Sequence, residues 1–159
     1  MNTFGRSAPL GMLCCVASLA APSGAEAARF QQTLAGACGA SAVCKLDSPV
    51  VAAGKTVEVT NVSCHLRLKD PGVPVRHQLQ VVQSNGVTVA LAVSLQPFFI
   101  GRDESIPVRS TYVSNHSVLA TAIQNQRFRV TTTVAPPIVS PSLGFFFEFS
   151  CHISGTQTP

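Results

Sequence analysis

Apolar and polar residues alternate with a period of two along almost all of the chain after residue 27, and no sustained helical period of 3.6 interrupts them. Val57 and Val59 put the apolar set on odd positions, whereas residues 62–68 put it on even positions. Because successive side chains of a strand point to opposite faces, this change of phase predicts a β-bulge or a break near Thr60 and Asn61. The pattern therefore predicts strands.

A β-hairpin is the clearest local prediction. The sequence Ser84-Asn85-Gly86 separates two alternating segments, residues 76–83 and 87–95. Asn-Gly suits the two positive φ angles of a type I′ turn, whose twist matches that of the flanking strands. The sequence therefore predicts an antiparallel hairpin closed by a type I′ turn.

Further strands are expected along the rest of the chain. Residues 106–113, 117–123, 127–134 and 145–153 alternate in the same way, and Gln124-Asn125-Gln126 is a candidate turn. Lys69-Asp70-Pro71-Gly72 is a second candidate turn. Residues 135–143 contain three prolines, which cannot donate to a ladder, so a loop is expected there. Residues 28–34 and 155–159 are expected to be frayed.

Roughly seven to nine short strands without a long helix predict an all-β fold. We expect an antiparallel β-sandwich, jelly-roll-like or immunoglobulin-like in outline and stapled by disulfides. A closed β-barrel is the alternative. Neither an internal repeat nor a low-complexity segment occurs in the sequence, so residues 28–159 are expected to form a single domain.

The first 27 residues have the features of a secretory signal peptide. Arg6 precedes an apolar run over residues 10–21, which is shorter than the ~20 residues that span a bilayer. Ala25-Glu26-Ala27 places small residues before Ala28, so cleavage is expected there, with cleavage after Ala25 as the alternative. Removal of 27 of the 159 residues would leave 132, the size of one domain. A secreted or periplasmic protein is expected.

The distribution of basic and apolar residues argues against a nucleic-acid partner and against a membrane span. The chain has a formal net charge of +4, but its basic residues are scattered rather than clustered in a stripe. A nucleic-acid partner is therefore not expected. After the leader no second long apolar run follows, so a membrane span is not expected in the mature chain either.

Four cysteines follow the leader, and four cysteines permit three pairings. Cys64 and Cys151 both fall on the apolar phase of their predicted strands, so both thiols are expected in the core. Cys38 and Cys44 could close a local loop. The preferred pairing is Cys64–Cys151 with Cys38–Cys44; bonds from Cys64 to Cys38 or Cys44 stay open as alternatives.

Two of these cysteines precede histidines, in Cys64-His65 and Cys151-His152. Cysteine and histidine are common zinc and copper ligands. Strand alternation turns both imidazoles outward when both thiols point inward, so the four side chains cannot converge on one ion. A surface pair of His65 and His152 could still bind a metal weakly if their strands are neighbours, but no metal or other cofactor is expected. His77 is in phase with apolar neighbours and is expected at the rim of the core.

Catalytic motifs are missing from the sequence. Neither a nucleophile elbow, nor a metalloprotease helix, nor a phosphate-binding glycine loop is present. Asp103-Glu104 is a pair of acids that could serve glycoside hydrolysis, but adjacent acids are typical of a solvated loop. We therefore assign no catalytic residue and expect a non-catalytic protein, with a secreted hydrolase as a less favoured alternative.

Two candidate binding surfaces emerge from the sequence. Phe98 and Phe99, followed by Arg102, could form an apolar platform with a polar rim on a loop. The favoured interpretation, however, is that the two rings plug one end of the sandwich and belong to the core. Arg127 and Arg129 share the polar face of a predicted strand and mark the second surface.

These surfaces predict a binding or surface-structural role, with a protein, a glycan or a small ligand as partner. A pilus- or coat-type subunit that donates a strand is the alternative. Such subunits carry a free alternating terminal segment, whereas the last predicted strand here contains Cys151 and is expected to be tied down.

Three motifs resemble a group of small exported bacterial proteins of unknown function. They are Val51-Ala52-Ala53-Gly54-Lys55, the strand from Val59 to Cys64, and Ile153-Ser154-Gly155. The group's first motif reads Val-Pro-Ala-Gly-Lys, so Ala52 replaces its proline. The resemblance implies a β-sandwich in the periplasm or outside the cell, and it implies no active site.

Overall fold

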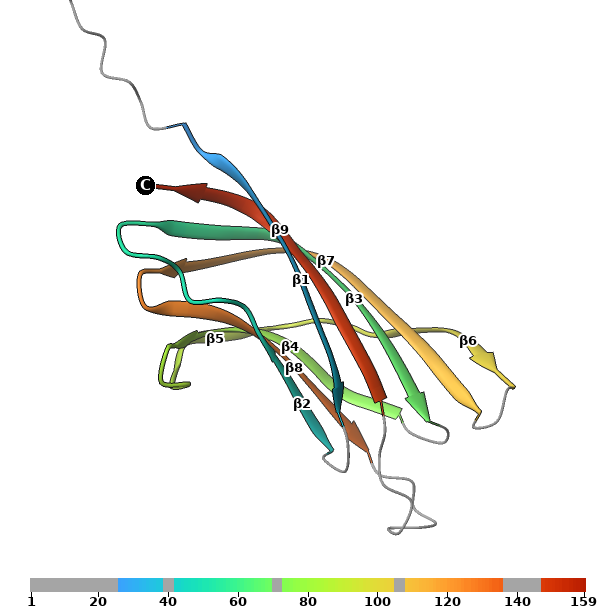
Figure 1. Cartoon of the computed structure of the whole chain (residues 1–159). Coiled ribbons are helices and arrows are strands. Elements are labelled where there is room, and N and C mark those ends of the chain that lie inside the picture. The colour runs from blue at the N-terminus through green and yellow to red at the C-terminus, as the bar shows by residue number, and fades with distance from the viewer. Residues whose placement is uncertain (1–25, 39–41, 70–72, 105–107, 136–146) are drawn as a thin grey trace, which may run out of the picture.

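The computed structural model describes residues 26–38, 42–69, 73–104, 108–135 and 147–159. These residues form nine strands: β1 (Ala28–Cys38), β2 (Val43–Asp47), β3 (Thr56–Lys69), β4 (Val73–Gln83), β5 (Thr88–Ser94), β6 (Phe98–Asp103), β7 (Arg109–Ile123), β8 (Gln126–Ala135) and β9 (Phe147–Thr158). They make two antiparallel sheets that pack face to face, with the orders β1-β9-β3-β7-β6 and β2-β8-β4-β5 (Figure 1). The predicted all-β sandwich is confirmed, and the two sheets are not closed into a barrel. No helix within these ranges is long and apolar enough to cross a membrane.

β3 is the central strand of the five-stranded sheet, and its two halves bury opposite sequence phases. Val57 and Val59 in the first half, and Val62 and Leu66 in the second, are at most 2% exposed. The register with both neighbouring strands shifts between Val59 and Asn61. This is the irregularity that the change of phase predicted, and it lets both halves face the same core.

β4 and β5 form the predicted hairpin, but the prediction that a type I′ turn closes it is wrong. Gly86 has a φ of 89°, whereas Asn85 does not have the positive φ that a type I′ turn requires. The amide of Gly86 donates to the carbonyl of Gln83 at 2.8 Å, and the amide of Gln83 donates to the carbonyl of Val87 at 2.8 Å. A type I turn followed by a left-handed glycine makes these bonds, so the loop has a third residue.

β7 runs without interruption from Arg109 to Ile123, where the sequence predicted two separate strands. Ser114, in the polar segment between them, is 1% exposed, and its hydroxyl lies 3.4 Å from Nδ1 of His77. The polar segment stays in the sheet because Ser114 finds a polar partner inside the core. The turn predicted at residues 124–126 is confirmed, with a φ of 66° at Asn125, and it carries the chain from one sheet to the other.

The first and last strands are paired, so the prediction of frayed ends is wrong. β1 pairs with β9 along its whole length, beginning with Ala28 opposite Gln157. β9 continues to Thr158, past the predicted end at Ile153. The partner of β1 lies at the other end of the chain, so local sequence could not reveal it.

Three other predictions lie outside the described residues. They are the turn at residues 70–72, the proline-containing loop at residues 136–143, and the first residues of the strands predicted to begin at 106 and 145.

The core lies between the two sheets, where their apolar faces meet. Its largest side chains that are at most 1% exposed are Phe128, Phe149, Leu66, Leu68, Leu79, Leu95 and Ile153. Burying one such side chain stabilises the fold by about 1.5–3 kcal/mol. The β5 side contributes less, since Val87 and Val89 are 58% and 47% exposed. The β4–β5 register shifts twice, and the apolar face predicted over residues 87–95 reaches the core at its second end, where Val93 packs against the core and Leu95 is 1% exposed.

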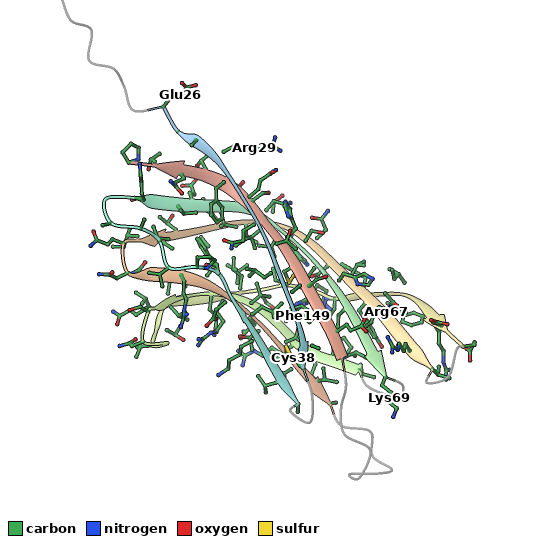
Figure 2. The ribbon with its side chains drawn as sticks, viewed as in Figure 1. Glu26, Arg29, Cys38, Arg67, Lys69 and Phe149 are labelled. Atoms are coloured by element: carbon green, nitrogen blue, oxygen red, sulfur yellow. A yellow bond between two sulfur atoms is a disulfide. The ribbon has the colours of Figure 1, made fainter. Side chains whose placement is uncertain are left out.

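Both predicted disulfides are present. Cys64–Cys151 joins directly opposed residues of β3 and β9, with Cα atoms 4.0 Å apart. Cys38–Cys44 joins the end of β1 to β2 and so ties an edge of one sheet to an edge of the other (Figure 2). The long-range disulfide therefore holds neighbours within one sheet, and the short-range disulfide holds the two sheets together.

Turn geometry explains why glycine occurs at position 54, in the motif Val51-Ala52-Ala53-Gly54-Lys55 that resembles small exported bacterial proteins. The segment 51–55 lies before β3, and Gly54 in it has a φ of 69°. The amide of Lys55 donates to the carbonyl of Ala52 at 3.1 Å, which closes the turn. Glycine adopts this left-handed conformation without the steric cost that a Cβ atom brings.

Candidate functional site

A cleft of about 310 Å³ opens where both sheets meet the link between β5 and β6. It is lined by residues 73–77 of β4, by Ser94 at the end of β5 and by residues 95–97 of the link. Phe99 of β6 and Tyr112 of β7 also line it. We call this space the β4–β6 cleft.

The link between β5 and β6 is fixed to both sheets, and this fixes the shape of the cleft. Leu95 is 1% exposed, and its amide donates to the carbonyl of His77 in β4 at 2.8 Å. The next amide, that of Gln96, donates to Nε2 of His116 in β7 at 2.8 Å. Two successive amides therefore bond to opposite layers, and the chain crosses from one sheet to the other at this point.

β6 presents three consecutive large apolar side chains to solvent. Phe98 and Phe99 are each 57% exposed, and Ile100 is 59% exposed. These residues lie in a strand rather than in the predicted loop, and they do not plug the end of the sandwich. The ring of Phe99 packs edge-on against Tyr112, with ring centroids 5.5 Å apart, which orients it beside the β4–β6 cleft.

The arginines named from the sequence lie apart from one another. Arg102 lies on β6 and pairs with Glu104, with Nε and Oε1 3.4 Å apart. Arg127 and Arg129 lie on β8, in the other sheet. The structure therefore places Arg102 on the strand that carries Phe98, and it places the two β8 arginines on a separate surface.

The two β8 arginines both pair with one carboxylate. Arg129 donates to Asp47 through Nε at 2.6 Å and Nη2 at 2.8 Å, and Nη2 of Arg127 lies 3.3 Å from the same carboxylate. The hydrogen bond from Arg129 lowers the pKa of Asp47, and the same bond raises the pKa of Arg129. Only 14% of the Arg129 side chain is exposed, so this pair holds β2 to β8 more than it offers charge to a ligand.

His77 lies at the border between the β4–β6 cleft and the core. It is 2% exposed, and its ring centroid lies 5.0 Å from that of Phe149. Its Nδ1 faces Ser114, whereas its Nε2 is buried without a hydrogen-bond partner among the described residues. The sequence indicated an in-phase histidine at the rim, and the structure places it fully inside.

His77 also lies against the Cys64–Cys151 disulfide. A ring nitrogen of His77 and both sulfur atoms lie within 4.8 Å of one another. Sequence reasoning missed this contact because His77 belongs to the opposite sheet, and strand phase does not say which strands face each other across a sandwich. His65 and His152 are exposed, as alternation predicted.

Burial lowers the pKa of His77 to about 4, and the nearby His116 adds a smaller effect in the same direction. The reason is that the imidazolium loses hydration in the core, where Phe149 and the disulfide offer it no compensating negative charge. His77 is therefore a neutral imidazole at neutral pH.

We expect acid to destabilise the fold through His77. An unfolded histidine has a pKa near 6.5, so between pH 6.5 and about 4 the unfolded chain binds one more proton than the folded chain. Stability is then full above pH 6.5 and is lost as the pH falls toward 4, by about 3 kcal/mol in total. Urea unfolding at pH 7.5 and pH 4 measures this loss.

The His77→Leu variant is the control for this loss, because leucine fills the site and does not titrate. The acid-induced loss in the variant should be smaller than in the parent by that same amount. An equal loss in the two proteins would contradict the assignment to His77.

The acidic pair considered for hydrolysis is engaged in ion pairs. Asp103 lies 3.4 Å from Arg67, and Glu104 lies 3.4 Å from Arg102. Asp103 closes β6, so it lies on a strand and not in the predicted loop. Arg67, near the end of β3 in Figure 2, also pairs with Glu148 at 3.6 Å. Asp103 thus belongs to a network with Arg67 and Glu148, and Glu104 pairs with Arg102.

No family model, no curated protein and no solved structure matches this chain. The resemblance to small exported bacterial proteins therefore rests on the three quoted motifs.

Proposed function

We propose that this protein is an exported, non-catalytic β-sandwich that binds an extended polypeptide segment at the edge formed by β6. The observation that carries the proposal is the run of Phe98, Phe99 and Ile100, each more than half exposed on an edge strand. Aromatic side chains are enriched in protein interfaces. The β4–β6 cleft beside them offers space for side chains of the bound segment.

The position of β6 supports this mode of binding. β6 is last in the order of the five-stranded sheet, and within the described ranges it pairs with β7 alone. An edge strand offers backbone donors and acceptors to a further strand, and side-chain pockets then supply specificity. An added strand would lie next to Phe98 and Ile100, with the cleft at one end.

Three observations support export. The first 27 residues have the composition of a signal peptide. Two disulfides suit an oxidising compartment such as the periplasm or the extracellular space. β1 begins at Ala28, the first residue after the expected cleavage position, so removal of the leader would leave the nine strands of the described residues intact.

A pilus- or coat-type subunit that donates a strand is less well supported. β1 and β9 are paired with each other, and each carries a disulfide cysteine, Cys38 and Cys151. A donated strand has to be free of its own sheet. Concentration-dependent polymerisation of the purified protein would instead favour this alternative.

A displayed library of extended peptides tests the proposed function. Peptides enriched on the purified protein serve as probes, and their affinities are measured by fluorescence anisotropy. The double variant Phe98→Ser/Phe99→Ser should weaken binding at least about tenfold, since buried aromatic anchors carry much of the energy of such interfaces. Because both rings are 57% exposed, its free energy of unfolding should fall by less than about 1 kcal/mol.

A matched control uses the exposed valines on and beside β5, at the edge of the other sheet. Val87→Ser/Val89→Ser changes side chains that are 58% and 47% exposed and should leave peptide binding unchanged. Equal binding by the phenylalanine variant and the parent, or failure to enrich any peptide, would refute the proposal. Severe destabilisation of the phenylalanine variant would show that these rings support the fold instead.

A further inference from the structure

Three metal-ligating side chains converge in the core behind the β4–β6 cleft. Cys64 of β3 and Cys151 of β9 come from one sheet, and His77 of β4 comes from the other. They are 3%, 1% and 2% exposed, and their ligand atoms all lie within 4.8 Å of one another. Two cysteines and one histidine are a ligand set that zinc takes in proteins, with water in the fourth position.

We propose that reduction of the Cys64–Cys151 disulfide by a dithiol converts this cluster into a zinc site. Cys64 and Cys151 supply two thiolates, and His77 supplies one imidazole nitrogen. The site exists in the reduced protein, because a disulfide sulfur has no thiolate charge to offer a metal. This inference is independent of peptide binding at β6.

Reduction of the disulfide and binding of zinc are two separate steps. The dithiol transfers two electrons and two protons, the S–S bond breaks, the two cysteines become thiols, and the reductant leaves as its own cyclic disulfide. Zn²⁺ then displaces one proton from each thiol, and both protons go to solvent.

Charge favours a divalent ion at this position. Two thiolates and Zn²⁺ sum to zero, whereas a monovalent ion would leave a net negative charge in the core. The strand neighbours on the same face are apolar, with Leu66 beside Cys64 and Phe149 beside Cys151, both 1% exposed. An uncompensated charge there is costly, so a neutral centre is preferred.

The surrounding structure keeps the three ligands together after the S–S bond breaks. β3 and β9 are hydrogen-bonded neighbours on both sides of the directly opposed Cys64 and Cys151, so in the folded protein the strand ladder holds their register as well as the disulfide does. His77 is held by the ring of Phe149 and by Ser114, and its Nε2 has no other hydrogen-bond partner in the described part of the chain. His77 also lines the β4–β6 cleft, so of the three ligands it is the one that the cleft brings to the solvent side of the cluster.

Metal titration tests the proposal in a chain where Cys64 and Cys151 are the two remaining thiols. Cys14, Cys15, Cys38 and Cys44 are replaced by serine, the protein is reduced with dithiothreitol, and the reductant is removed without air. Zn²⁺ is titrated against a chromophoric chelator, and Co²⁺ reports thiolate ligation through its charge-transfer absorption. The reduced protein should bind one equivalent of zinc, and the oxidised protein should bind none.

Three variants show whether the three ligands act together. His77→Leu should weaken zinc binding at least about tenfold, and Cys151→Ser should do so as well. His65→Leu is the matched control, because His65 adjoins Cys64 in sequence but is exposed on the opposite face; it should bind zinc like the parent. Circular dichroism checks that each variant keeps its strands.

Equal zinc affinity in the His77→Leu variant and the parent would overturn the proposal. Absence of zinc binding by the reduced, folded protein would also overturn it. A second comparison, of His77→Leu with the otherwise natural chain after reduction, covers the case in which the four serines impair folding. There the variant should hold one equivalent of zinc less at the same free zinc concentration, and no difference would count against the site.

Discussion

Replacing Cys64 and Cys151 by alanine is expected to lower the free energy of unfolding by about 4.5 kcal/mol. The two cysteines are 87 positions apart, so their bond restricts a long segment of the unfolded chain. A domain of ordinary stability has ~5–15 kcal/mol in total, so this loss is a large fraction of it. Urea unfolding at neutral pH, where His77 is neutral in both states, gives the difference without a contribution from titration.

The Cys38→Ala/Cys44→Ala variant is the matched control for this prediction. Its cysteines are 6 positions apart, so the same loop-entropy argument gives a loss of about 2 kcal/mol. The long-range pair should therefore cost roughly twice as much as the short-range pair. Equal losses for the two pairs would show that local packing, and not restriction of the unfolded chain, determines how much each disulfide adds to the free energy of unfolding.

The sequence predicts those features of the fold that depend on strand phase. The inward position of Cys64 and Cys151, the outward position of His65 and His152, and the bulge after Val59 all follow from a period of two. A single residue out of phase would expose a whole apolar set, so phase is strongly constrained wherever one face is buried.

The candidate site depends on which strands face each other, and strand phase does not give that information. Ser114 taken alone looks like a break in an apolar strand, and His77 taken alone looks like a rim residue. Across the sandwich the two are polar partners, 3.4 Å apart, and each explains why the other is tolerated in the core. The pairing of β1 with β9 is hidden in the same way, because it joins the two ends of the domain.

The edge strand β6 shows a different limit of sequence reasoning. Phe98 and Phe99 are strongly apolar, and apolar residues are usually buried, so the sequence favours a core position for them. Whether such residues are covered depends on where the sheet ends. β6 is the last strand of its sheet, so these rings remain exposed.

Gly155→Ala is expected to lower the free energy of unfolding by more than about 3 kcal/mol, beyond the usual range for overpacking a core. Gly155 in β9 lies opposite Val59, at the bulge of β3. A Cβ atom there would overlap the carbonyl oxygen of Glu58 and lie 2.9 Å from the Cα of Val59. Both are backbone atoms, so a rotamer change cannot relieve the clash and the strands themselves must separate.

Gly101→Ala is the matched control, because it makes the same chemical change within a strand of the same sheet. A Cβ atom at Gly101 would meet nothing within 4 Å, and its φ is not in the left-handed region. This variant should unfold within about 0.5 kcal/mol of the parent in urea. If Gly155→Ala proved equally harmless, β3 and β9 could not approach each other as closely at the bulge as the structure places them. The bulge lets both halves of β3 face one core, and β9 can pack against the bulge because Gly155 has no side chain.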